Sequence, residues 1–323
     1  MNPVVSIIIP TYNRAHLIGE TLDSVLAQTF KFWECIVVDD GSTDHTEELL
    51  QFYCEKDSRI KFYYRPKDRP KGANACRNYG LKESRGKYVN WFDSDDLMDS
   101  EKLSIQVERL EQSNYNFTVC QTVVFKTNLS YILGLRHEEI FSANTFEDYL
   151  CEKIGWLTQA PLWNKSFLVQ NNFKFDETLL AAQEWEFHCR VLIVSSNYDW
   201  IDQPLVYIRQ HNDSISYEPK NENLREWYYF LARLKIYRKQ RLRLPGDVKD
   251  YLQLFLLHKF KSFVRKKSLK KSVVAFFYFI VREKELTLIS KISGFLAIFS
   301  FALFGRGHIF TKKVKFGYKS ILL

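Results

Sequence analysis

Short apolar runs that end abruptly in acidic residues, separated by stretches of helical periodicity, constrain the fold of this chain more than any other feature. Residues 4–9 form an apolar run that Pro10 closes, and residues 35–38 form a second, which ends in Asp39 and Asp40. Apolar runs of this length are typical of strands that are buried on both faces of a sheet. Between the two runs, at positions 15–28, apolar residues recur at helical spacing and predict a helix.

The same alternation continues through the first hundred residues. It predicts a helix from residue 42 to about 55, a strand at 60–64, a helix at 73–83 and a strand at 87–92. Ser42 or Thr43 would cap the first of these helices. Alternating strands and helices predict a mostly parallel α/β sheet, in which ligands bind where loops leave the carboxyl ends of the strands. Acidic residues lie at two such ends, in residues 39–40 and 93–96.

Beyond residue 118 the periodicity is weaker and then changes character. We predict strands at 119–125 and 205–209, a helix at 183–195, and two further helices at 223–243 and 248–263. No internal repeat is present in the sequence.

The charge also divides the chain in two. Up to Glu218 there are 22 Lys and Arg against 32 Asp and Glu, whereas from Pro219 onward there are 24 against 6. The sequence therefore predicts two domains, residues 1–218 and 219–323. The second would face an anionic partner such as a membrane surface or a nucleic acid.

The six cysteines show no pairing pattern. None belongs to a CxxC pair, and the first residues lack the basic segment and cleavage site of a secretory signal. Thiols without such spacing are typical of a reducing compartment. These features predict a cytoplasmic location.

The acidic residues at the strand ends are candidate ligands. Carboxylates at one strand end repel each other, so a fold that keeps Asp93, Asp95 and Asp96 together usually neutralises them with a cation or with hydrogen bonds. Oxygen ligands suit Mg²⁺ or Mn²⁺, which in turn would bind a diphosphate. The alternative is a solvated turn or helix cap, and for Asp39 and Asp40 the two interpretations are compatible. Neither a P-loop nor a GxGxxG motif is present, so nothing supports a P-loop NTPase or a dinucleotide dehydrogenase.

Four motifs in this region resemble those of family 2 glycosyltransferases with the GT-A fold. They are residues 6–14 (SIIIPTYNR), 37–44 (VVDDGSTD), 75–80 (ACRNYG) and 93–96 (DSDD), in the order of the family. Residues 183–187 (QEWEF) are similar to the acidic motif of the family, and residues 207–216 to its later histidine-containing motif. The resemblance covers about residues 4–216. It implies a Rossmann-like, nucleotide-binding mixed sheet flanked by helices.

The resemblance also implies which residues bind the donor nucleotide. They come from the first four motifs and are Pro10, Thr11, Tyr12, Arg14, Asp39, Asp40, Arg77, Asp93 and Asp95. Within this set, the first three would line the uracil and Asp40 or Asp39 would bind the base. Arg77 would lie near the diphosphate or the base, and Asp95 would contact the ribose or the sugar.

A divalent cation, Mn²⁺ or Mg²⁺, is assigned by the resemblance to Asp96, with Asp95 as a second ligand and Asp93 in support. His211 is a further candidate for the cation or the diphosphate, because neutral imidazole binds cations and imidazolium binds phosphate. A lone histidine after a strand is as often an ordinary surface or core residue. Both interpretations of His211 stay open at this point.

The catalytic base implied by the resemblance is Glu184. The family often has aspartate here, so the side chain is one methylene longer and Glu186 stays an alternative. Inverting transfer from a nucleotide sugar needs one base for the acceptor hydroxyl, because the leaving group is a metal-bound nucleotide. A glycosidase would need two carboxyls flanking the bond. Without the motif, Glu184 would be interpreted as an exposed helix residue.

Three tryptophans are candidates for an acceptor platform that stacks on a sugar ring: Trp156, Trp163 and Trp185. Large aromatic residues are more often part of the core, and we favour the core for these three. The region between residues 119 and 180 predicts no other acceptor residue.

Two apolar runs lie in the basic C-terminal region, at residues 273–281 and 292–304. Both are shorter than the roughly 18–20 residues that span a bilayer. Seven of the thirteen residues at 259–271 are basic, which favours attachment to an anionic membrane surface. The alternative is a helical subdomain with a solvated basic face. Nucleic acid is disfavoured, because the aromatic residues cluster in apolar runs and no nucleic-acid-binding motif is present.

Together these features predict a metal-dependent inverting glycosyltransferase of the bacterial surface-polysaccharide type, with a membrane-associated helical C-terminal region at the inner face of the cell membrane. The donor would be a UDP-sugar that supplies a hexosyl or N-acetylhexosaminyl group. The acceptor would be a hydroxyl of a glycan or a lipid-linked glycan. Two alternatives remain, a nucleotidyltransferase acting on sugar phosphates and a non-catalytic nucleotide-binding scaffold. The sequence predicts neither the sugar, the linkage nor the oligomeric state.

Overall fold

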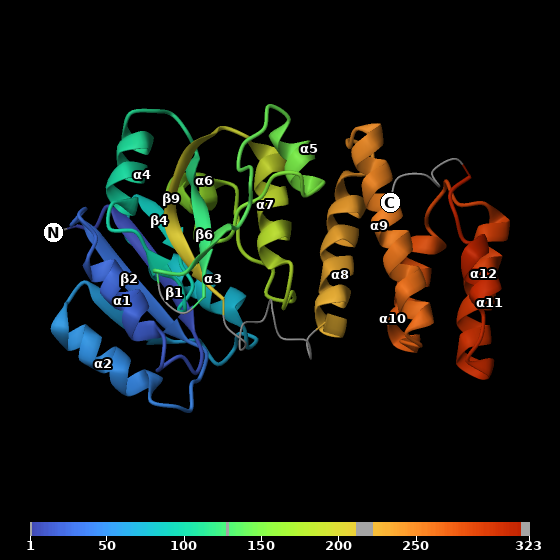
Figure 1. The fold of residues 1–323 in the computed structure, drawn as a ribbon, viewed down its shortest axis with the longest axis horizontal. Helices are drawn as coiled ribbons and strands as arrows, with labels where there is room; N and C mark the ends of the chain where they lie inside the picture. The colour runs from blue at the N-terminus through green and yellow to red at the C-terminus, as the bar shows by residue number, and fades with distance from the viewer. Residues whose placement is uncertain (1, 127–128, 211–221, 318–323) are drawn as a thin grey trace. The chain divides into compact units, whose positions relative to one another are not determined.

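The computed structural model describes residues 2–126, 129–210 and 222–317 (Figure 1). The chain forms two compact units, residues 1–221 and 222–323, and each has its own buried apolar core. The boundary predicted between residues 218 and 219 lies outside the described residues.

One mixed sheet forms the centre of the first unit. Its described strands are β1 (Val5–Thr11), β2 (Trp33–Asp39), β3 (Ile60–Tyr64), β4 (Tyr88–Trp91), β5 (Leu97–Met98), β6 (Phe117–Phe125), β7 (Ile132–Leu135), β8 (Pro161–Asn164) and β9 (Tyr198–Arg209). Their order is β3-β2-β1-β4-β8-β6-β9-β5, and β7 pairs with β6. The four strands predicted in the first hundred residues are parallel, as expected. Strands β5, β7 and β8 run antiparallel to their neighbours and make the sheet mixed.

Helices pack on this sheet because its inner strands are apolar on both faces, and every residue of β1 and β2 is buried. The described helices of the unit are α1 (Ile18–Leu26), α2 (Thr46–Lys56), α3 (Ala73–Glu83), α4 (Lys102–Glu111), α5 (Thr145–Leu150), α6 (Lys165–Gln170) and α7 (Gln183–Val194). Gly80 allows α3 to lie directly against β1, since a Cβ at this position would come within 2.3 Å of Ile8 Cγ2. This close approach explains the glycine of the motif at residues 75–80.

Helix α2 begins at Thr46, later than predicted. Ser42 and Thr43 do not cap it, because both bind the loop that follows β1. The Ser42 hydroxyl accepts a hydrogen bond from the Asn13 amide at 2.8 Å, and the Thr43 amide donates to Asn13 Oδ1 at 2.8 Å. Asp44 instead accepts a hydrogen bond from the Thr46 amide at 3.1 Å. The loops after β1 and β2 are thereby fixed to each other.

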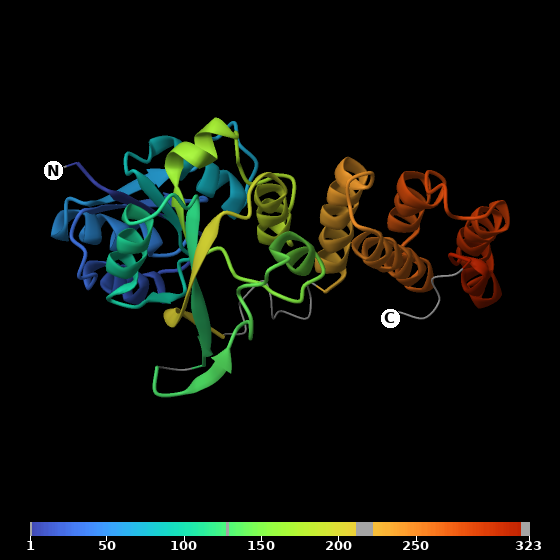
Figure 2. The same cartoon turned by 90° about the horizontal axis from the view of Figure 1, so that it is seen from above.

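The second half of the unit brings distant segments to the strand ends. Strand β9 pairs with β5 so that Leu97 lies opposite Tyr207, which brings the end of β9 to the segment after β4. Strands β6 and β7 form a hairpin that projects beyond the rest of the sheet (Figure 2). Antiparallel pairing of β8 with β4 places residues 156–160, which precede β8, close to the same segment.

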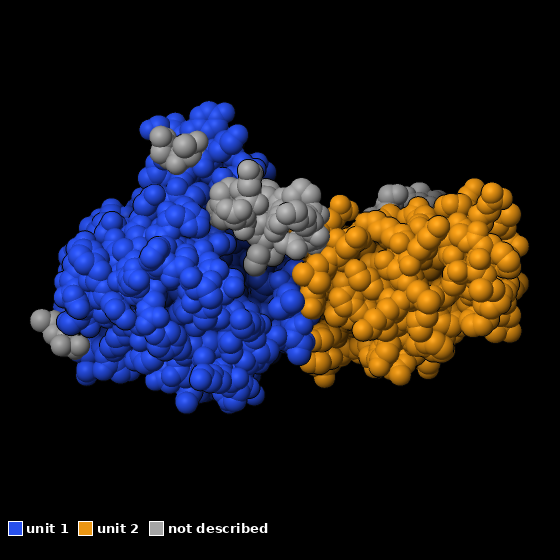
Figure 3. All heavy atoms as spheres, turned by 90° about the horizontal axis from the view of Figure 1, so that it is seen from below, with its two compact units in different colours: residues 1–221 blue, residues 222–323 orange. Residues whose placement is uncertain are grey.

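The second unit, orange in Figure 3, is helical, as predicted. Its described elements are α8 (Glu222–Gln240), α9 (Gly246–Arg265), α10 (Leu269–Ala275), the π-helical turn η2 (Phe276–Ile280), α11 (Leu288–Phe304) and α12 (His308–Lys313). The apolar run at residues 273–281 forms the end of α10 and η2, and the run at 292–304 lies in α11. Among the helices that the structure describes, none has the length and apolar character needed to cross a membrane.

Candidate active site

The carboxyl ends of β1, β2 and β4 meet at one edge of the sheet. Thr11, which ends β1, lies opposite Asp39, which ends β2, and Ile8 lies opposite Trp91 in β4. The strand order reverses between β1 and β4, and open α/β sheets bind ligands at such a point. The two acidic segments predicted at strand ends therefore share this edge, which defines the candidate active site.

Hydrogen bonds hold the aspartates that follow β4 together. Asp93 accepts hydrogen bonds from Arg77 Nη2 at 2.7 Å and from Gln159 Nε2 at 2.8 Å. The same Gln159 amide donates to Asp96 Oδ2. One glutamine side chain thus joins two carboxylates that would otherwise repel each other.

Asp96 is buried, whereas Asp93 and Asp95 are partly exposed. Asp96 Oδ1 accepts a hydrogen bond from the Arg209 amide at 2.9 Å, and Arg209 Nε donates to the Asp95 carbonyl oxygen at 3.0 Å. Burial raises the pKa of Asp96 well above its ordinary value, and the charges of Asp95 and Asp93 raise it further. The pairing of β9 with β5 therefore positions Arg209 to support a carboxylate that burial disfavours.

The aspartate cluster has the chemistry that a hard divalent cation prefers. Its carboxylate oxygens suit Mg²⁺ and Mn²⁺. Gln159 Oε1 is buried and has no hydrogen-bond partner among the described residues, so this amide oxygen is available beside the carboxylates. A cation at Asp95 and Asp96 would offset the repulsion that raises the pKa of Asp96. The residues therefore fit a divalent cation, although in the described part of the chain no three His, Cys, Asp or Glu side chains are arranged as ligands.

Protein groups hold the two aspartates at the end of β2. Asp39 Oδ2 accepts hydrogen bonds from two backbone amides of the following turn, at 3.0 and 2.9 Å. Asp40 forms an ion pair with Arg65 and accepts a hydrogen bond from the Gly72 amide at 2.8 Å. Asp39 therefore closes the turn after β2. Asp40 joins β2 to the loop that carries Arg65, beside the candidate site.

The end of β1 contributes the side chains predicted to line the donor base. Pro10 and Thr11 are buried, and the Thr11 hydroxyl has no hydrogen-bond partner among the described residues. Tyr12 is 46% exposed. Arg14 Nε lies 3.7 Å from Asp95 Oδ2, so this loop also reaches the aspartate cluster. The buried hydroxyl of Thr11, the exposed ring of Tyr12 and the guanidinium of Arg14 thus lie close together in sequence at the end of β1.

Arg77 is buried beneath the aspartate cluster. Besides its bond to Asp93, it donates from Nη1 to Asn74 Oδ1 at 3.1 Å. Its guanidinium lies 5.2 Å from the ring centroid of Phe175, and its Nε has no partner among the described residues. This geometry makes Arg77 a residue that positions Asp93. Direct contact of Arg77 with a nucleotide stays a prediction.

Glu184 lies in the first turn of α7, close to Asp93 and partly exposed. The chain enters this helix through Ala182, which adopts a left-handed conformation with φ 57°. Thr158 Oγ1 donates to Glu184 Oε2 at 3.3 Å. Burial and the charge of Asp93 raise the pKa of Glu184, while Arg77 lowers it in part. A carboxyl with a raised pKa at this edge of the sheet is suited to remove a proton from a bound hydroxyl.

Glu186, the alternative base, has a structural partner. Its carboxylate is buried and accepts two hydrogen bonds from Arg190, one turn further along α7, at 2.8 and 3.0 Å. Such a bidentate pair is among the stronger side-chain interactions and stabilises the helix. The geometry therefore favours Glu184 over Glu186 as the base.

The three tryptophans considered for an acceptor platform are buried, in agreement with the core interpretation that we favoured. Trp163 stacks on Phe117 with ring centroids 4.3 Å apart, and Trp156 packs against Tyr149 at 4.5 Å. Buried rings leave no open face on which a sugar could stack. His211, the candidate histidine, lies outside the described residues.

Four further residues complete the site and were not predicted from the sequence. Thr158 and Gln159 precede β8 in a segment without a recognisable pattern. Arg136 follows β7, and its charge lowers the pKa of Glu184. Arg209 belongs to the motif at residues 207–216, which could have pointed to it.

A mixed sheet with acids at the ends of β2 and β4 is the arrangement expected of a GT-A-like nucleotide-sugar transferase. Comparison of the folds agrees with this class. Residues 1–349 of S. aureus TarS, solved in complex with UDP-GlcNAc, superpose with a TM-score of 0.68 and 21% sequence identity. The likeness covers 92% of this chain and 87% of that structure.

Sequence comparison gives the family. A glycosyltransferase of Rickettsia felis is 39% identical over 142 residues, which cover 44% of this chain and 23% of that protein. WfgD of Escherichia coli, named UDP-Glc:alpha-D-GlcNAc-diphosphoundecaprenol beta-1,3-glucosyltransferase, is 40% identical over 115 residues, which cover 35% of this chain and 44% of WfgD. Residues 6–161, just under half of the chain, match the family described as Glycosyl transferase family 2, so this part of the chain is a glycosyltransferase family 2 domain. The chain spans less than a quarter of the length of the first curated relatives that it matches.

Proposed function

We propose that the protein is a metal-dependent, inverting glycosyltransferase that moves a sugar from a UDP-sugar to a hydroxyl of a glycan or lipid-linked glycan. The position of Glu184 carries this proposal. One carboxyl with a raised pKa lies close to a cluster of aspartates, at the edge where β1, β2 and β4 end. One base and one cation-binding cluster are what direct displacement of a nucleoside diphosphate requires.

In this mechanism Glu184 takes the proton from the attacking hydroxyl. The hydrogen bond from Thr158, at 3.3 Å, orients one of its oxygens. Asp93 disfavours the ionised form of Glu184, whereas Arg77 and Arg136 favour it. Burial, together with Asp93, outweighs the two arginines and keeps the pKa of Glu184 above the ordinary value of a glutamate. A base works best when its pKa lies near the working pH.

The aspartate cluster would hold the donor diphosphate. Asp96 and Asp95 would bind a divalent cation, which supplies Lewis-acid stabilisation of the departing diphosphate. Hydrogen bonds from the Arg209 amide and the Gln159 side chain favour the charged form of Asp96 and offset part of the effect of burial on its pKa. Gln159 also donates to Asp93, so the two carboxylates keep one relative orientation.

The donor base would lie against the ends of β1 and β2. Tyr12 offers an exposed ring for stacking, and the buried Thr11 hydroxyl offers a hydrogen bond. TarS, which shares the fold, was solved with UDP-GlcNAc, and WfgD is named for UDP-Glc, so both support a UDP-sugar. The diphosphoundecaprenol in the name of WfgD supports a lipid-linked acceptor.

Product analysis tests the reaction class. The full chain would be incubated with UDP-Glc, UDP-GlcNAc or GDP-Man, with Mn²⁺ or Mg²⁺, and with a polyprenyl-diphosphate-linked sugar as acceptor. We expect release of UDP and one added sugar whose anomeric configuration is inverted in the NMR spectrum. Release of pyrophosphate would identify a nucleotidyltransferase instead. Donor binding without transfer or hydrolysis, whatever the acceptor, would identify a scaffold.

A further inference from the structure

Helix α11 carries most of its large apolar side chains on the solvent side. Seven of them, spaced mainly by three or four positions, form one face of the helix, here called the α11 face: Leu288, Ile289, Ile292, Phe295, Leu296, Phe299 and Leu303. Phe304, the last residue of the helix, is also exposed. Leu288 is 71% exposed and Phe295 is 55% exposed. A surface helix of a globular domain normally turns such a face toward the core. The pattern of α11 is therefore inverted.

The opposite side of α11 packs against the rest of the unit mainly through small residues. Ser290, Ser293, Gly294 and Ala297 are buried, together with one large side chain, Phe301. A Cβ on Gly294 would lie only 3.2 Å from Phe276 Cε2, so the helix already approaches η2 closely. Close packing on this side fixes which side of the helix faces outward.

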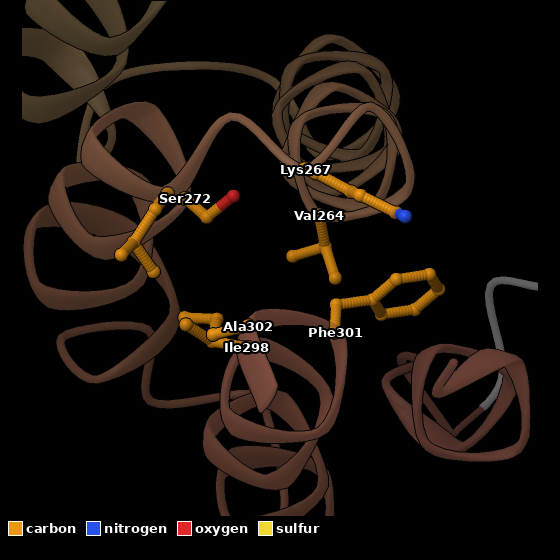
Figure 4. A pocket seen from close by; sticks show the side chains of 7 residues that line it. Val264, Lys267, Ser272, Ile298, Phe301 and Ala302 are labelled. Carbon is orange, nitrogen blue, oxygen red and sulfur yellow. The ribbon is translucent and has the colours of Figure 1, made fainter. Parts of the chain in front are cut away.

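A small pocket lies beside α11, and the α11 face is not part of its lining. Figure 4 shows Ile298, Phe301 and Ala302 of α11 around this pocket, with Val264 of α9 and Ser272 of α10 on its other sides. None of the seven residues of the α11 face lines it. In the part of the chain that the structure describes, no element covers the α11 face.

The charge around α11 is of one sign. No Asp or Glu follows Glu285 in the sequence. The cations that the structure describes in and after α11 are Lys291, Arg306, Lys312, Lys313 and Lys315. An exposed apolar face on a segment that carries cations and no carboxylates is complementary to a bilayer that contains anionic lipids.

The basic cluster at residues 259–271, from which the sequence predicted membrane attachment, is partly neutralised. Lys266 Nζ lies 2.8 Å from Glu226 and 3.3 Å from Glu222, and Lys259 Nζ lies 3.3 Å from Glu226. Burial lowers the pKa of Lys261. Three of the seven cations of the cluster are therefore less available to an anionic surface than the sequence suggests.

We propose that the α11 face binds the surface of an anionic lipid bilayer, with α11 lying in the plane of the interface. The helix has 17 residues, and apolar side chains of this kind insert at the boundary between headgroups and acyl chains when a helix lies flat. A second copy of the chain fits this face less well, because its own cations would meet like charges. Membrane binding of this kind is separate from the transfer reaction and is measured without it.

Flotation of the full chain with lipid vesicles tests this assignment. One set of vesicles is phosphatidylcholine alone, and the other contains about 30% phosphatidylglycerol. We expect the protein to float with the anionic vesicles, with about tenfold weaker binding to the neutral ones and weaker binding at high salt.

Two matched variants assign the binding to α11. Phe295→Ser combined with Phe299→Ser should weaken partitioning onto anionic vesicles by about tenfold or more, because two apolar side chains are lost from the face. Phe52→Ser replaces a phenylalanine of α2 that is 56% exposed in the first unit, and it should bind as the wild type does. All three positions are exposed, so circular dichroism and the thermal midpoint should confirm that both variants fold.

Wild-type protein that stays in the soluble fraction with anionic vesicles would overturn the proposal, and so would a double variant that floats like the wild type. Self-association that the double variant abolishes, without flotation, would assign the face to a second copy. An Asp96→Asn variant should float like the wild type. Loss of flotation and loss of transfer are therefore separate results.

Discussion

Each of the two units contains a place that departs from the usual rules of folding, and these two departures are of different kinds. In the first unit, aspartates gather at one strand end, and burial together with like charge raises the pKa of Asp96. In the second unit, α11 exposes phenylalanine and leucine side chains and buries serine and glycine. The first departure costs electrostatic free energy, and the second leaves apolar surface in water.

Each departure indicates what the unit would bind. A cation would remove the repulsion among the aspartates, and a lipid surface would cover the α11 face. Away from these places both units follow ordinary rules, as in β1 and β2, where every residue is buried. Arrangements of side chains that cost local stability are expected at functional sites.

Replacing the proposed base should have the largest effect. Glu184→Gln keeps the size of the side chain and removes the proton acceptor, so the transfer rate should fall by ~10²–10⁴-fold while donor binding persists. The wild-type rate should fall as the pH drops through the raised pKa of Glu184, because the protonated carboxyl cannot accept a proton. A pH–rate profile and calorimetric titration of the donor measure both effects.

Glu186→Gln is the matched control on the same helix. It weakens the pair with Arg190, so the thermal midpoint should fall while the rate per folded molecule and its pH profile stay close to those of the wild type. A full loss of transfer in Glu186→Gln, with an active Glu184→Gln, would exchange the two assignments.

Asp96→Asn tests the first departure through opposite effects on activity and stability. Transfer should fall by roughly 10²-fold because cation binding weakens. Without a cation, the variant should nevertheless have the higher thermal midpoint. Burial raises the pKa of Asp96 in the folded protein above the ordinary value of an aspartate, 3.8. The wild type therefore loses stability as the pH rises above 3.8, whereas the variant, whose asparagine does not ionise, keeps its stability. Scanning calorimetry in chelator should show a difference in thermal midpoint between the variant and the wild type that is small near pH 3.8 and larger at neutral pH. A variant that is less stable at neutral pH would contradict this.

Glu34 provides the contrast within the same sheet, because its carboxylate is buried but well paired. Burial alone would raise its pKa, yet hydrogen bonds from Lys61, the Arg85 amide and Ser6 lower it overall. Glu34→Gln should therefore lower the free energy of unfolding by about 1–3 kcal/mol at neutral pH. The wild-type advantage is fully present above the ordinary pKa of 4.5 and is lost as the pH falls through the lowered value. Urea unfolding at several pH values measures this difference in free energy of unfolding. Equal stability of the two proteins at neutral pH would contradict a stabilising role for the hydrogen bonds of Glu34.

The smallest effect is expected on the α11 face. Ile292→Ala should change the free energy of unfolding by at most about 0.5 kcal/mol, because the side chain is already exposed. Ile236→Ala, at a buried position of α8, should cost about 2–5 kcal/mol. Denaturant unfolding of both variants compares them. Similar losses at the two positions would mean that the α11 face is covered in solution.

Much of the first unit could be predicted because its signals are local. The strand at residues 60–64 and the helix at 73–83 have the predicted bounds, and the acids at 39–40 and 93–96 follow strands whose direction the alternation determines. The start of α2 was wrong because Asn13, from another loop, binds Ser42 and Thr43.

Other features depend on contacts between distant segments, which periodicity does not report. Gln159 lies 63 positions from Asp96, and Arg209 lies 113 positions from it. The run at residues 292–304 is apolar on most sides, so the sequence did not indicate which side of α11 faces solvent. That side is determined by the small residues that pack against η2.

Calorimetric titration of UDP tests most directly the central claim that the acidic edge binds a UDP-sugar through a divalent cation. The full chain would be titrated with Mn²⁺ and in excess chelator, beside Asp96→Asn and Glu184→Gln. We predict saturable binding with Mn²⁺ that weakens by about tenfold or more in chelator and in Asp96→Asn, and that persists in Glu184→Gln. Equal affinity for UDP under all of these conditions, or no binding in any of them, would contradict the claim.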